Sequence, residues 1–270
     1  MGKPRVVWTI AGFDPTSGAG ITGDLKTIAS FNCYGAACIT ALTVQNTLGV
    51  FRVEPVSPAT VHDTLQALLD DLPPSSIKIG MLARADIVSI VADFLDGHST
   101  CPVVLDPVLR SSSGAELLEA AGICILRDRL LPRATVVTPN RSEASILTGL
   151  PIDNPEAMAI ALRQLGSAAA VVTGGDSLQH NVSDDSQDVL AYSIRDMDFV
   201  ETLSAPRQHS SSTHGTGCAF STAIACALAQ GQNIPTAVTT AKAFVGRALE
   251  LAPGLGGGHG PMGLEHAGKS

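Results

Sequence analysis

Short apolar runs recur along this chain, and stretches with helical spacing of apolar residues separate several of them. The runs are Val6–Ala11, Ala36–Val44, Ile77–Met81, Val103–Asp106, Thr135–Thr138 and Ala169–Thr173. The amphipathic stretches are Pro58–Leu69, Asp86–Leu95, Ala115–Leu130, Ser142–Leu147 and Glu156–Leu165. Continuous apolar strands that alternate with helices are typical of a parallel sheet covered on both faces. The pattern therefore predicts an α/β protein.

The last third of the chain predicts a different arrangement. Val189–Ile194 and Phe199–Leu203 have the pattern of a β-hairpin, and helices are expected over Cys218–Ala229 and Thr236–Leu251. A chain of 270 residues is long enough to bury one full α/β core. Because glycine is frequent near the C-terminus, we expect a main domain at 1–252 and an irregular tail at 253–270.

Composition and charge exclude several classes of partner. Hydrophobic residues make up 45% of the chain and charged residues 16%, which indicates a globular protein. The net charge of −8, without a basic run, argues against nucleic-acid binding. No apolar stretch reaches the ~18 residues of a membrane span, and the N-terminus lacks a signal-peptide cleavage pattern. The six cysteines form no C-x-x-C pair, which disfavours a zinc site and favours reduced thiols in a cytoplasmic protein.

The loop after the first apolar run reads AGFDPTSGAGITGDLK and contains a G-x-G-x-x-G sequence at Gly18–Gly23. In a dinucleotide site this motif directly follows the strand, and an acidic residue ends the next strand. Here FDPTS separates the strand from the glycines, and the next strand ends in Gln45 and Asn46. We therefore disfavour an NAD site and expect a substrate loop in which Asp24 accepts hydrogen bonds from a small ligand. A plain glycine-rich turn is the alternative.

A second glycine-rich segment, Thr213–Cys218 with the sequence THGTGC, precedes a long helix of small residues. Successive backbone N–H groups at a helix N-terminus form an anion site, which would stabilise the charge of a transferred phosphate. Cys218 would lie in the first turn, where the helix dipole lowers a thiol pKa, and its thiolate could take a proton from an attacking hydroxyl. The alternative is a loop needed for close packing, with a buried cysteine and with His214 as an ordinary hydrogen-bonding residue.

Acidic and amide side chains follow two further strands. Asp106 ends the strand VVLDP, and Asn140 and Glu143 follow the strand TVVTP. A carboxylate at the carboxyl end of a strand can hold Mg²⁺, usually through water. Glu143 also stands at about the third position of a helix, where it would cap the helix N-terminus. Two acidic sites at strand ends, together with an anion loop, favour metal–phosphate chemistry.

Six segments in order resemble the hydroxymethylpyrimidine/phosphomethylpyrimidine kinases of thiamine biosynthesis, which belong to the ribokinase-like superfamily. They are AGFDPTSGAGITGDLKT, ITALTVQNT, KIGML, VVLDPV, TPNRSE and THGTGC, and Gly258–Pro261 resembles the family's C-terminal signature. The match runs from about Val7 to Leu251. The resemblance implies a three-layer α/β/α sandwich with a mostly parallel central sheet, in a homodimer. It also implies that ATP and Mg²⁺ are used to phosphorylate 4-amino-5-hydroxymethyl-2-methylpyrimidine and then its monophosphate.

By motif position the resemblance implies roles for individual residues. The substrate residues are Asp24, Gln45, which reads the polar edge of the pyrimidine, Met81, which packs on its ring, and Gly12. The anion hole is formed by Gly215, Thr216, Gly217 and Cys218, with Cys218 in the position of the catalytic base. The ATP site is assigned to Asp106, Asn140, Glu143, Thr173, Gly175 and Thr213. The metal is assigned to Asp106 and Glu143.

The sequence departs from the family pattern at the ATP site. The family usually has Lys-Gly-Gly-His after the sixth apolar run, whereas this chain has TGGD at 173–176. Because the lysine is expected to contact the ATP phosphates, another cation would have to substitute, and Arg110 and Lys242 are the candidates. Two alternatives stay open. One is a pyridoxal kinase of the same superfamily, and the other is a non-catalytic ligand-binding paralogue, which the missing lysine favours.

Overall fold

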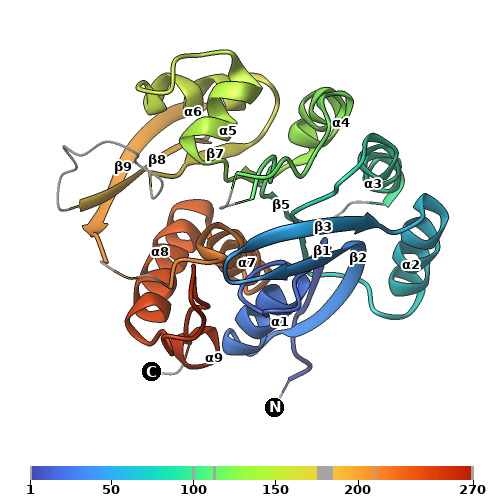
Figure 1. Cartoon of the computed structure of the whole chain (residues 1–270). Helices are drawn as coiled ribbons and strands as arrows, with labels where there is room; N and C mark the ends of the chain where they lie inside the picture. The colour runs from blue at the N-terminus through green and yellow to red at the C-terminus, as the bar shows by residue number, and fades with distance from the viewer. Residues whose placement is uncertain are drawn as a thin grey trace.

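A single sheet runs through the residues that the computed structural model describes, which are 2–98, 101–111, 114–174, 185–208, 210 and 212–268. Its strands lie in the order β3-β2-β1-β4-β5-β6-β7-β8-β9 (Figure 1). Pairing is parallel from β2 to β7 and antiparallel for β3, β8 and β9. The strands are β1 (Val6–Phe13), β2 (Tyr34–Asn46), β3 (Gly49–Pro55), β4 (Ser76–Ile79), β5 (Val103–Leu105), β6 (Val136–Val137), β7 (Ala169–Val172), β8 (Asp185–Ile194) and β9 (Met197–Pro206).

All six apolar runs form strands of the parallel part of the sheet, and the predicted hairpin is formed by β8 and β9. The sequence-based prediction lacks β3. This strand reads GVFRVEP, pairs with β2 at one edge of the sheet and has no fully buried residue. An edge strand of this kind has no continuous apolar run, so the pattern that indicates the inner strands is absent from it.

Helices connect the strands on both faces of the sheet. They are α1 (Gly20–Ser30), α2 (Pro58–Asp71), α3 (Ala85–His98), α4 (Ala120–Ile125), α5 (Arg141–Thr148), α6 (Pro155–Gln164), α7 (Thr216–Ala229), α8 (Ile234–Glu250) and α9 (Leu264–Ala267). None of these described helices is long and apolar enough to cross a membrane.

The helix predicted over Ala115–Leu130 begins only at Ala120 and continues through a π-helical turn at Leu126–Leu130. The residues before it take a different path. Arg110 and Glu116 form an antiparallel β-bridge, and the Leu117 N–H donates to the Leu109 carbonyl oxygen at 2.9 Å. The segment therefore pairs with the loop after β5 before it turns into helix, a long-range pairing that helical spacing alone does not reveal.

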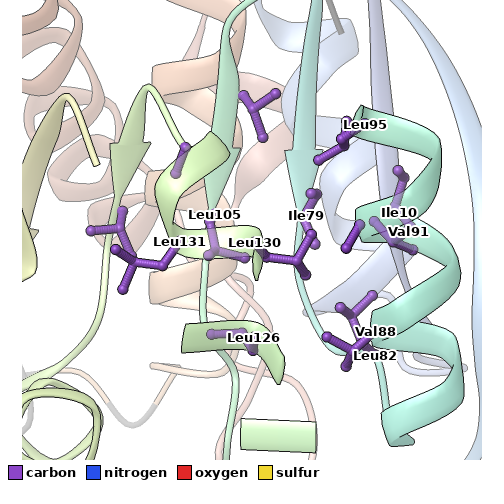
Figure 2. Packing of buried hydrophobic residues seen from close by; sticks show 14 of the residues in the cluster. Ile10, Ile79, Leu82, Val88, Val91, Leu95, Leu105, Leu126, Leu130 and Leu131 are labelled. Carbon is purple, nitrogen blue, oxygen red and sulfur yellow. The ribbon is translucent and has the colours of Figure 1, made fainter. Parts of the chain in front are cut away.

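Neighbouring residues of the inner strands enter two different cores. In β1, Val7 joins the core formed with α1, α7 and α8, whereas Trp8 joins the core formed with α2, α3, α5 and α6. Figure 2 shows part of the second core, in which Ile79 of β4 lies close to Val91 of α3. Figure 1 shows the two groups of helices on opposite sides of the sheet. The alternation of strand side chains thus produces the three-layer α/β/α sandwich.

The C-terminal residues pack against the main domain. Met262, Leu264 and Ala267 are buried in the same core as α7 and α8, and the Gly263 N–H donates to the Ala248 carbonyl oxygen at 2.9 Å. The stretch is irregular except for α9, as expected from its glycines. Because its apolar side chains complete this core, the described part of the tail is a structural part of the domain.

Candidate active site

The carboxyl ends of the parallel strands lie along one edge of the sheet. The chain passes from β1 to β2 on one side of β1 and returns to β4 on the other, so the ends of β1 and β4 form a topological switch point, where α/β proteins bind ligands. Gly12 and Met81 meet here. A Cβ atom on Gly12 would lie 3.0 Å from the Met81 sulfur, so glycine lets the backbone approach the thioether. The structure brings these two predicted substrate residues together.

The predicted anion loop leads into α7. Gly215 is the N-cap of this helix with a φ of +81°, and a Cβ atom there would overlap the Gly18 carbonyl oxygen. Only glycine allows both the left-handed conformation and this contact. No side chain caps α7, so the N–H groups of Gly217 and Cys218 are oriented as in an anion site. The space around Gly217 is open.

Cys218 lies in the first turn of α7, as predicted, but its thiol is not a stabilised anion. Burial raises the pKa of the Cys218 thiol to about 12, and the nearby carboxylates of Asp106 and Asp24 offset the lowering effect of the Lys78 ammonium. Desolvation therefore outweighs the two effects that lower this pKa, the Lys78 charge and a hydrogen bond from the Gly20 backbone. The prediction of a resting thiolate is wrong, because a thiol with this pKa is protonated at neutral pH.

A charged pair is completely buried next to the anion loop. The Lys78 Nζ on β4 lies 2.9 Å from the Asp24 Oδ2 on α1, and neither side chain has exposed surface. Thr222 of α7 donates to the Asp24 Oδ1 at 2.8 Å, and Thr9 of β1 donates to the Oδ2 at 2.5 Å. One carboxylate therefore joins two strands and two helices, including the helix that carries the anion loop.

This cluster corrects the prediction for Asp24. The residue lies within α1 rather than in a loop, and protein donors contact both of its oxygens. Its side chain has no exposed surface, so a substrate cannot reach it from this position. Lys78 is a site residue that the sequence reasoning missed. Burial lowers its pKa, but the carboxylates of Asp24 and Asp106 raise it above the ordinary value, so the ammonium stays charged. A single lysine within the apolar strand SIKIG was the available signal.

Asp106 follows β5 and has only 5% of its surface exposed. Ser221 of α7 donates to its Oδ2 at 3.2 Å. Burial raises the pKa of Asp106 above its ordinary value, although the Lys78 charge and the hydrogen bonds of Ser221 and Cys218 act in the opposite direction. The structure thus brings together Asp106 and Cys218, which the sequence analysis placed in the ATP site and the anion hole.

Asn140 and Glu143 form a capping box at the start of α5. The Asn140 Oδ1 accepts from the Glu143 N–H at 2.9 Å, and the Glu143 Oε2 accepts from the Asn140 N–H at 3.0 Å. The Glu143 Oε1 accepts from the Leu109 N–H at 3.3 Å. The capping interpretation of Glu143 is confirmed. Among the described residues no group of three or more His, Cys, Asp or Glu side chains could hold a metal, and with both oxygens engaged Glu143 fits Mg²⁺ through water only.

Thr173 lies beside Asn140 at the ends of β7 and β6. The two residues form a parallel β-bridge, and the Thr173 N–H donates to the Pro139 carbonyl oxygen at 2.9 Å. Because β5, β6 and β7 are neighbours in the sheet, the strand ends that carry Asp106, Asn140 and Thr173 are adjacent. Gly175, also predicted in the ATP site, lies outside the described residues.

The tail brings a further side chain to the anion loop. The His259 Nδ1 lies 3.1 Å from the Oγ1 of Thr213, a predicted ATP residue. The His259 N–H donates to the Thr47 carbonyl oxygen at 2.9 Å, and Pro261 forms a parallel β-bridge with His214. The tail therefore connects the loop before α7 to the turn between β2 and β3.

A second buried carboxylate, Asp14, lies in the loop after β1. Its Oδ2 is 2.7 Å from the His214 Nε2, and Thr16 donates to its Oδ1 from both the backbone and the hydroxyl at 2.8 Å. Burial alone would raise the pKa of Asp14, but the hydrogen bonds of His214 and Thr16 lower it to about 2. Gln45, at the end of β2, lies 3.4 Å from the same His214 nitrogen. The sequence analysis missed this pair because Asp14 and His214 are 200 residues apart.

The family model for phosphomethylpyrimidine kinase matches residues 14–263. The chain belongs to the phosphomethylpyrimidine kinase family. The hydroxymethylpyrimidine/phosphomethylpyrimidine kinase of Haemophilus influenzae is 42% identical over 97% of each chain. A phosphomethylpyrimidine kinase structure from Clostridium difficile is 32% identical, with a TM-score of 0.76 over 90% of this chain and 99% of that one. An ADP complex of Bacillus subtilis pyridoxal kinase is 31% identical, with a TM-score of 0.85 over 96% and 97%. The family and the fold class predicted from sequence are confirmed.

Lys242 and Arg110, the two cations considered as substitutes for the family lysine, have different surroundings in this kinase. The Lys242 Nζ lies 2.6 Å from the Asp188 Oδ2, and both side chains are largely buried. The Asp188 Oδ1 accepts from the Gly174 N–H at 2.9 Å, so Lys242 is part of a structural connection to the loop after Thr173. Arg110 is exposed, and its guanidinium lies 3.7 Å from the exposed Glu116 carboxylate. Such a surface pair contributes little to stability and can be exchanged for a phosphate.

Replacing Arg110 with alanine tests whether this side chain supplies the missing charge. We expect kcat/KM for ATP to fall by about tenfold or more, since a charge-assisted phosphate contact would be lost, while the melting temperature changes little. Glu116→Ala is the matched control, because it removes the same surface pair without removing the cation. An unchanged rate in Arg110→Ala would contradict the substitution.

Proposed function

We propose that this kinase transfers the γ-phosphoryl group of ATP to the hydroxymethyl group of 4-amino-5-hydroxymethyl-2-methylpyrimidine, and a second phosphoryl group to the monophosphate. The observation that carries this proposal is the uncapped α7 N-terminus with Gly215–Cys218 at the switch-point edge of the sheet. Backbone N–H groups held in this way stabilise a phosphoryl group in transfer without reorganisation. The 42% identity to a relative of that name supports the substrate.

The substrate ring would lie at the ends of β1, β2 and β4. Gly12 and Met81 form one wall, and Met81 belongs to a small apolar cluster with Ala41 and Leu117. Gln45 provides a half-buried amide at the polar side. A flat, partly polar ring with one hydroxymethyl group suits this combination of a thioether wall and one amide.

ATP would lie over the adjacent ends of β5, β6 and β7, with Asp106, Asn140 and Thr173 at their ends. The ADP complex of the Bacillus subtilis pyridoxal kinase supports a nucleotide in this fold. When bound, Mg²⁺ would neutralise the negative charge that develops on the phosphate groups. Asp106 and Glu143 would contact its water molecules, since Mg²⁺ keeps much of its hydration shell. These assignments stay predictions.

The raised thiol pKa changes the route by which the substrate proton leaves. We propose a relay through Cys218. As the substrate oxygen forms its bond to phosphorus and ADP departs, the hydroxyl proton passes to the Cys218 sulfur and the thiol proton passes to Asp106. The hydrogen bond between the Cys218 side chain and Asp106 provides the path for the second proton transfer.

The alternative of a pyridoxal kinase is favoured by one specific finding, the pyridoxal kinase structures with TM-scores of 0.85 and above. Pyridoxal also carries a hydroxymethyl group on a flat ring, so the geometry of the site accepts either class. Sequence identity to those two pyridoxal kinases is 31% and 30%, below the 42% identity to the Haemophilus influenzae kinase but similar to the 32% identity to the Clostridium difficile structure.

The deciding experiment offers the purified protein the hydroxymethylpyrimidine, its monophosphate and pyridoxal in parallel, with ATP and Mg²⁺, and identifies products by mass. We expect ADP formation together with the mono- and diphosphorylated pyrimidines. Pyridoxal phosphate as the sole product would select the alternative. Ligand binding without ADP formation would indicate a non-catalytic paralogue.

We also propose a homodimer, because the edge hairpin of β2 and β3 presents large apolar side chains to solvent. Leu42, Val44, Leu48 and Phe51 are each 46–67% exposed. Exposed apolar side chains gathered on one element mark an interaction surface. We expect light scattering to give the mass of two chains, and Phe51→Lys to give one. Ile152→Lys, at an exposed apolar residue elsewhere, is the control and should leave the mass unchanged.

A further inference from the structure

The Asp14–His214 pair determines the protonation of one ring nitrogen. Asp14 is a carboxylate with several donors around it, since the Thr16 N–H donates to Oδ1 at 2.8 Å and the Ala19 N–H donates to Oδ2 at 2.9 Å. The His214 Nε2 lies 2.7 Å from the same Oδ2. An unprotonated nitrogen at that distance would place its lone pair against an anionic oxygen. The Nε2 therefore carries a hydrogen and donates it to Asp14.

This protonation limits how Gln45 can contact the histidine. The structure places the Gln45 Nε2, the amide nitrogen, 3.4 Å from the His214 Nε2. A protonated nitrogen has no lone pair to accept a hydrogen bond, so the NH₂ group of Gln45 cannot donate to it. A half-turn about the last side-chain bond exchanges the amide oxygen and nitrogen with almost the same shape. The chemistry therefore orients the Gln45 oxygen toward His214 and the NH₂ group away from it.

The histidine ring is itself held in place. A Cβ atom on Gly18 would overlap the His214 Cδ2, so the ring packs directly on the Gly18 backbone. The backbone N–H of His214 donates to the Gly260 carbonyl oxygen at 3.2 Å. Glycine at 18 thus allows the ring to lie where it can contact both Asp14 and Gln45.

We propose that Asp14 and His214 are positioning residues that orient the Gln45 amide so that its NH₂ group faces the substrate, and that the site thereby selects a ring with a hydrogen-bond acceptor at that point. The inference rests on the proposed function for the presence of a ring beside Gln45. Among the described residues Gln45 has no other hydrogen-bond partner, so its NH₂ group is available to a ligand. On the pyrimidine the matching group is a ring nitrogen, whereas the exocyclic amino group would need an acceptor.

The test compares kcat/KM for 4-amino-5-hydroxymethyl-2-methylpyrimidine with three analogues. Two analogues have one ring nitrogen replaced by CH, and the third lacks the amino group. In the wild type we expect one of the two nitrogen replacements to lower kcat/KM by about tenfold. Gln45→Glu keeps the shape of the side chain but has no donor, so it should lower the parent rate by about tenfold and remove the discrimination against that analogue. If Gln45→Glu instead removes the discrimination against the analogue that lacks the amino group, the proposal is overturned.

The positioning role is tested by variants that leave Gln45 unchanged. Asp14→Leu, which has a similar shape and no acceptor, and Gly18→Ala should each reduce the discrimination between parent and analogue to about twofold or less. The ¹⁵N spectrum of His214 should show that the Nε2 carries a hydrogen at pH 7 in the wild type. Gly246→Ala is the matched control, because a Cβ atom there meets nothing within 4 Å, and it should change neither readout.

The failure of the proposed function can be told apart from failure of this inference. If the wild type phosphorylates none of the pyrimidines, the function is wrong, and the ¹⁵N spectrum decides the histidine separately. An unprotonated Nε2 at pH 7 in the wild type overturns the inference whatever the substrate. Full discrimination in Asp14→Leu would overturn the positioning role.

Discussion

Cys218→Ala is expected to lower kcat by about 100-fold or more, the usual contribution of a general base, while changing the free energy of unfolding by no more than about 1 kcal/mol. The reason is its place in the proposed relay, between the substrate hydroxyl and Asp106. Asp106→Asn should reduce kcat to a similar extent because it removes the final proton acceptor. Cys218→Ser should retain more activity than Cys218→Ala, since a hydroxyl can also accept one proton while donating another.

The pH dependence separates this relay from a preformed thiolate. The relay needs Asp106 ionised, so kcat should fall as the pH drops through the pKa of Asp106 in the Mg²⁺-loaded enzyme. The Cys218 pKa of about 12 means that no rise in rate between pH 7 and 9 should come from the thiol. A rise in kcat between pH 7 and 9 that disappears in Cys218→Ser would show that the thiolate is the base. Circular dichroism of each variant provides the control for folding.

Lys78→Met is expected to destabilise the fold by about 3–5 kcal/mol, because it leaves the Asp24 carboxylate buried without its counter-charge. Asp24→Asn should cost a similar amount by leaving the ammonium unpaired. The double variant Lys78→Met/Asp24→Leu removes both charges and should recover much of the loss. Urea denaturation measures the free energy of unfolding in each case.

A matched lysine provides the control for this cluster. Lys26 forms an exposed pair with Glu265 at 3.1 Å, and Lys26→Met should cost less than about 1 kcal/mol. The folded-state pKa of Lys78 is raised, so its contribution to stability is fully present below the unfolded pKa and is lost only above it. The difference between the two variants should therefore be constant from pH 6 to 9. A loss below 1 kcal/mol in Lys78→Met would contradict the structural role of the pair.

Local patterns in the sequence predicted the elements that depend on local interactions. The apolar runs indicate the inner strands, and the residues at their ends, such as Asp106 and Asn140, lie at one edge because parallel strands place their carboxyl ends together. The capping role of Glu143 also follows from its spacing to Asn140. The edge strand β3 was not predicted, because its residues are not buried and it therefore has no continuous apolar run.

The site's electrostatics were decided by tertiary structure. The helix dipole at Cys218 is a local property and was visible in the sequence, but the desolvation that raises its pKa comes from elements that pack around it. Thr222 reaches Asp24 across 198 residues, and His214 reaches Asp14 across 200. No spacing rule connects such residues, so a motif identifies the family while only the fold shows which charges face each other.

By itself, then, the sequence determined the layered α/β fold, the position of the anion loop and the kinase family, because each depends on short-range pattern or on motifs in order. The tertiary structure decided the charge state of Cys218, the burial of Asp24 with Lys78 and the position of Gln45 beside His214. These depend on distance and on exclusion of water, and both are set by contacts between segments far apart in the chain.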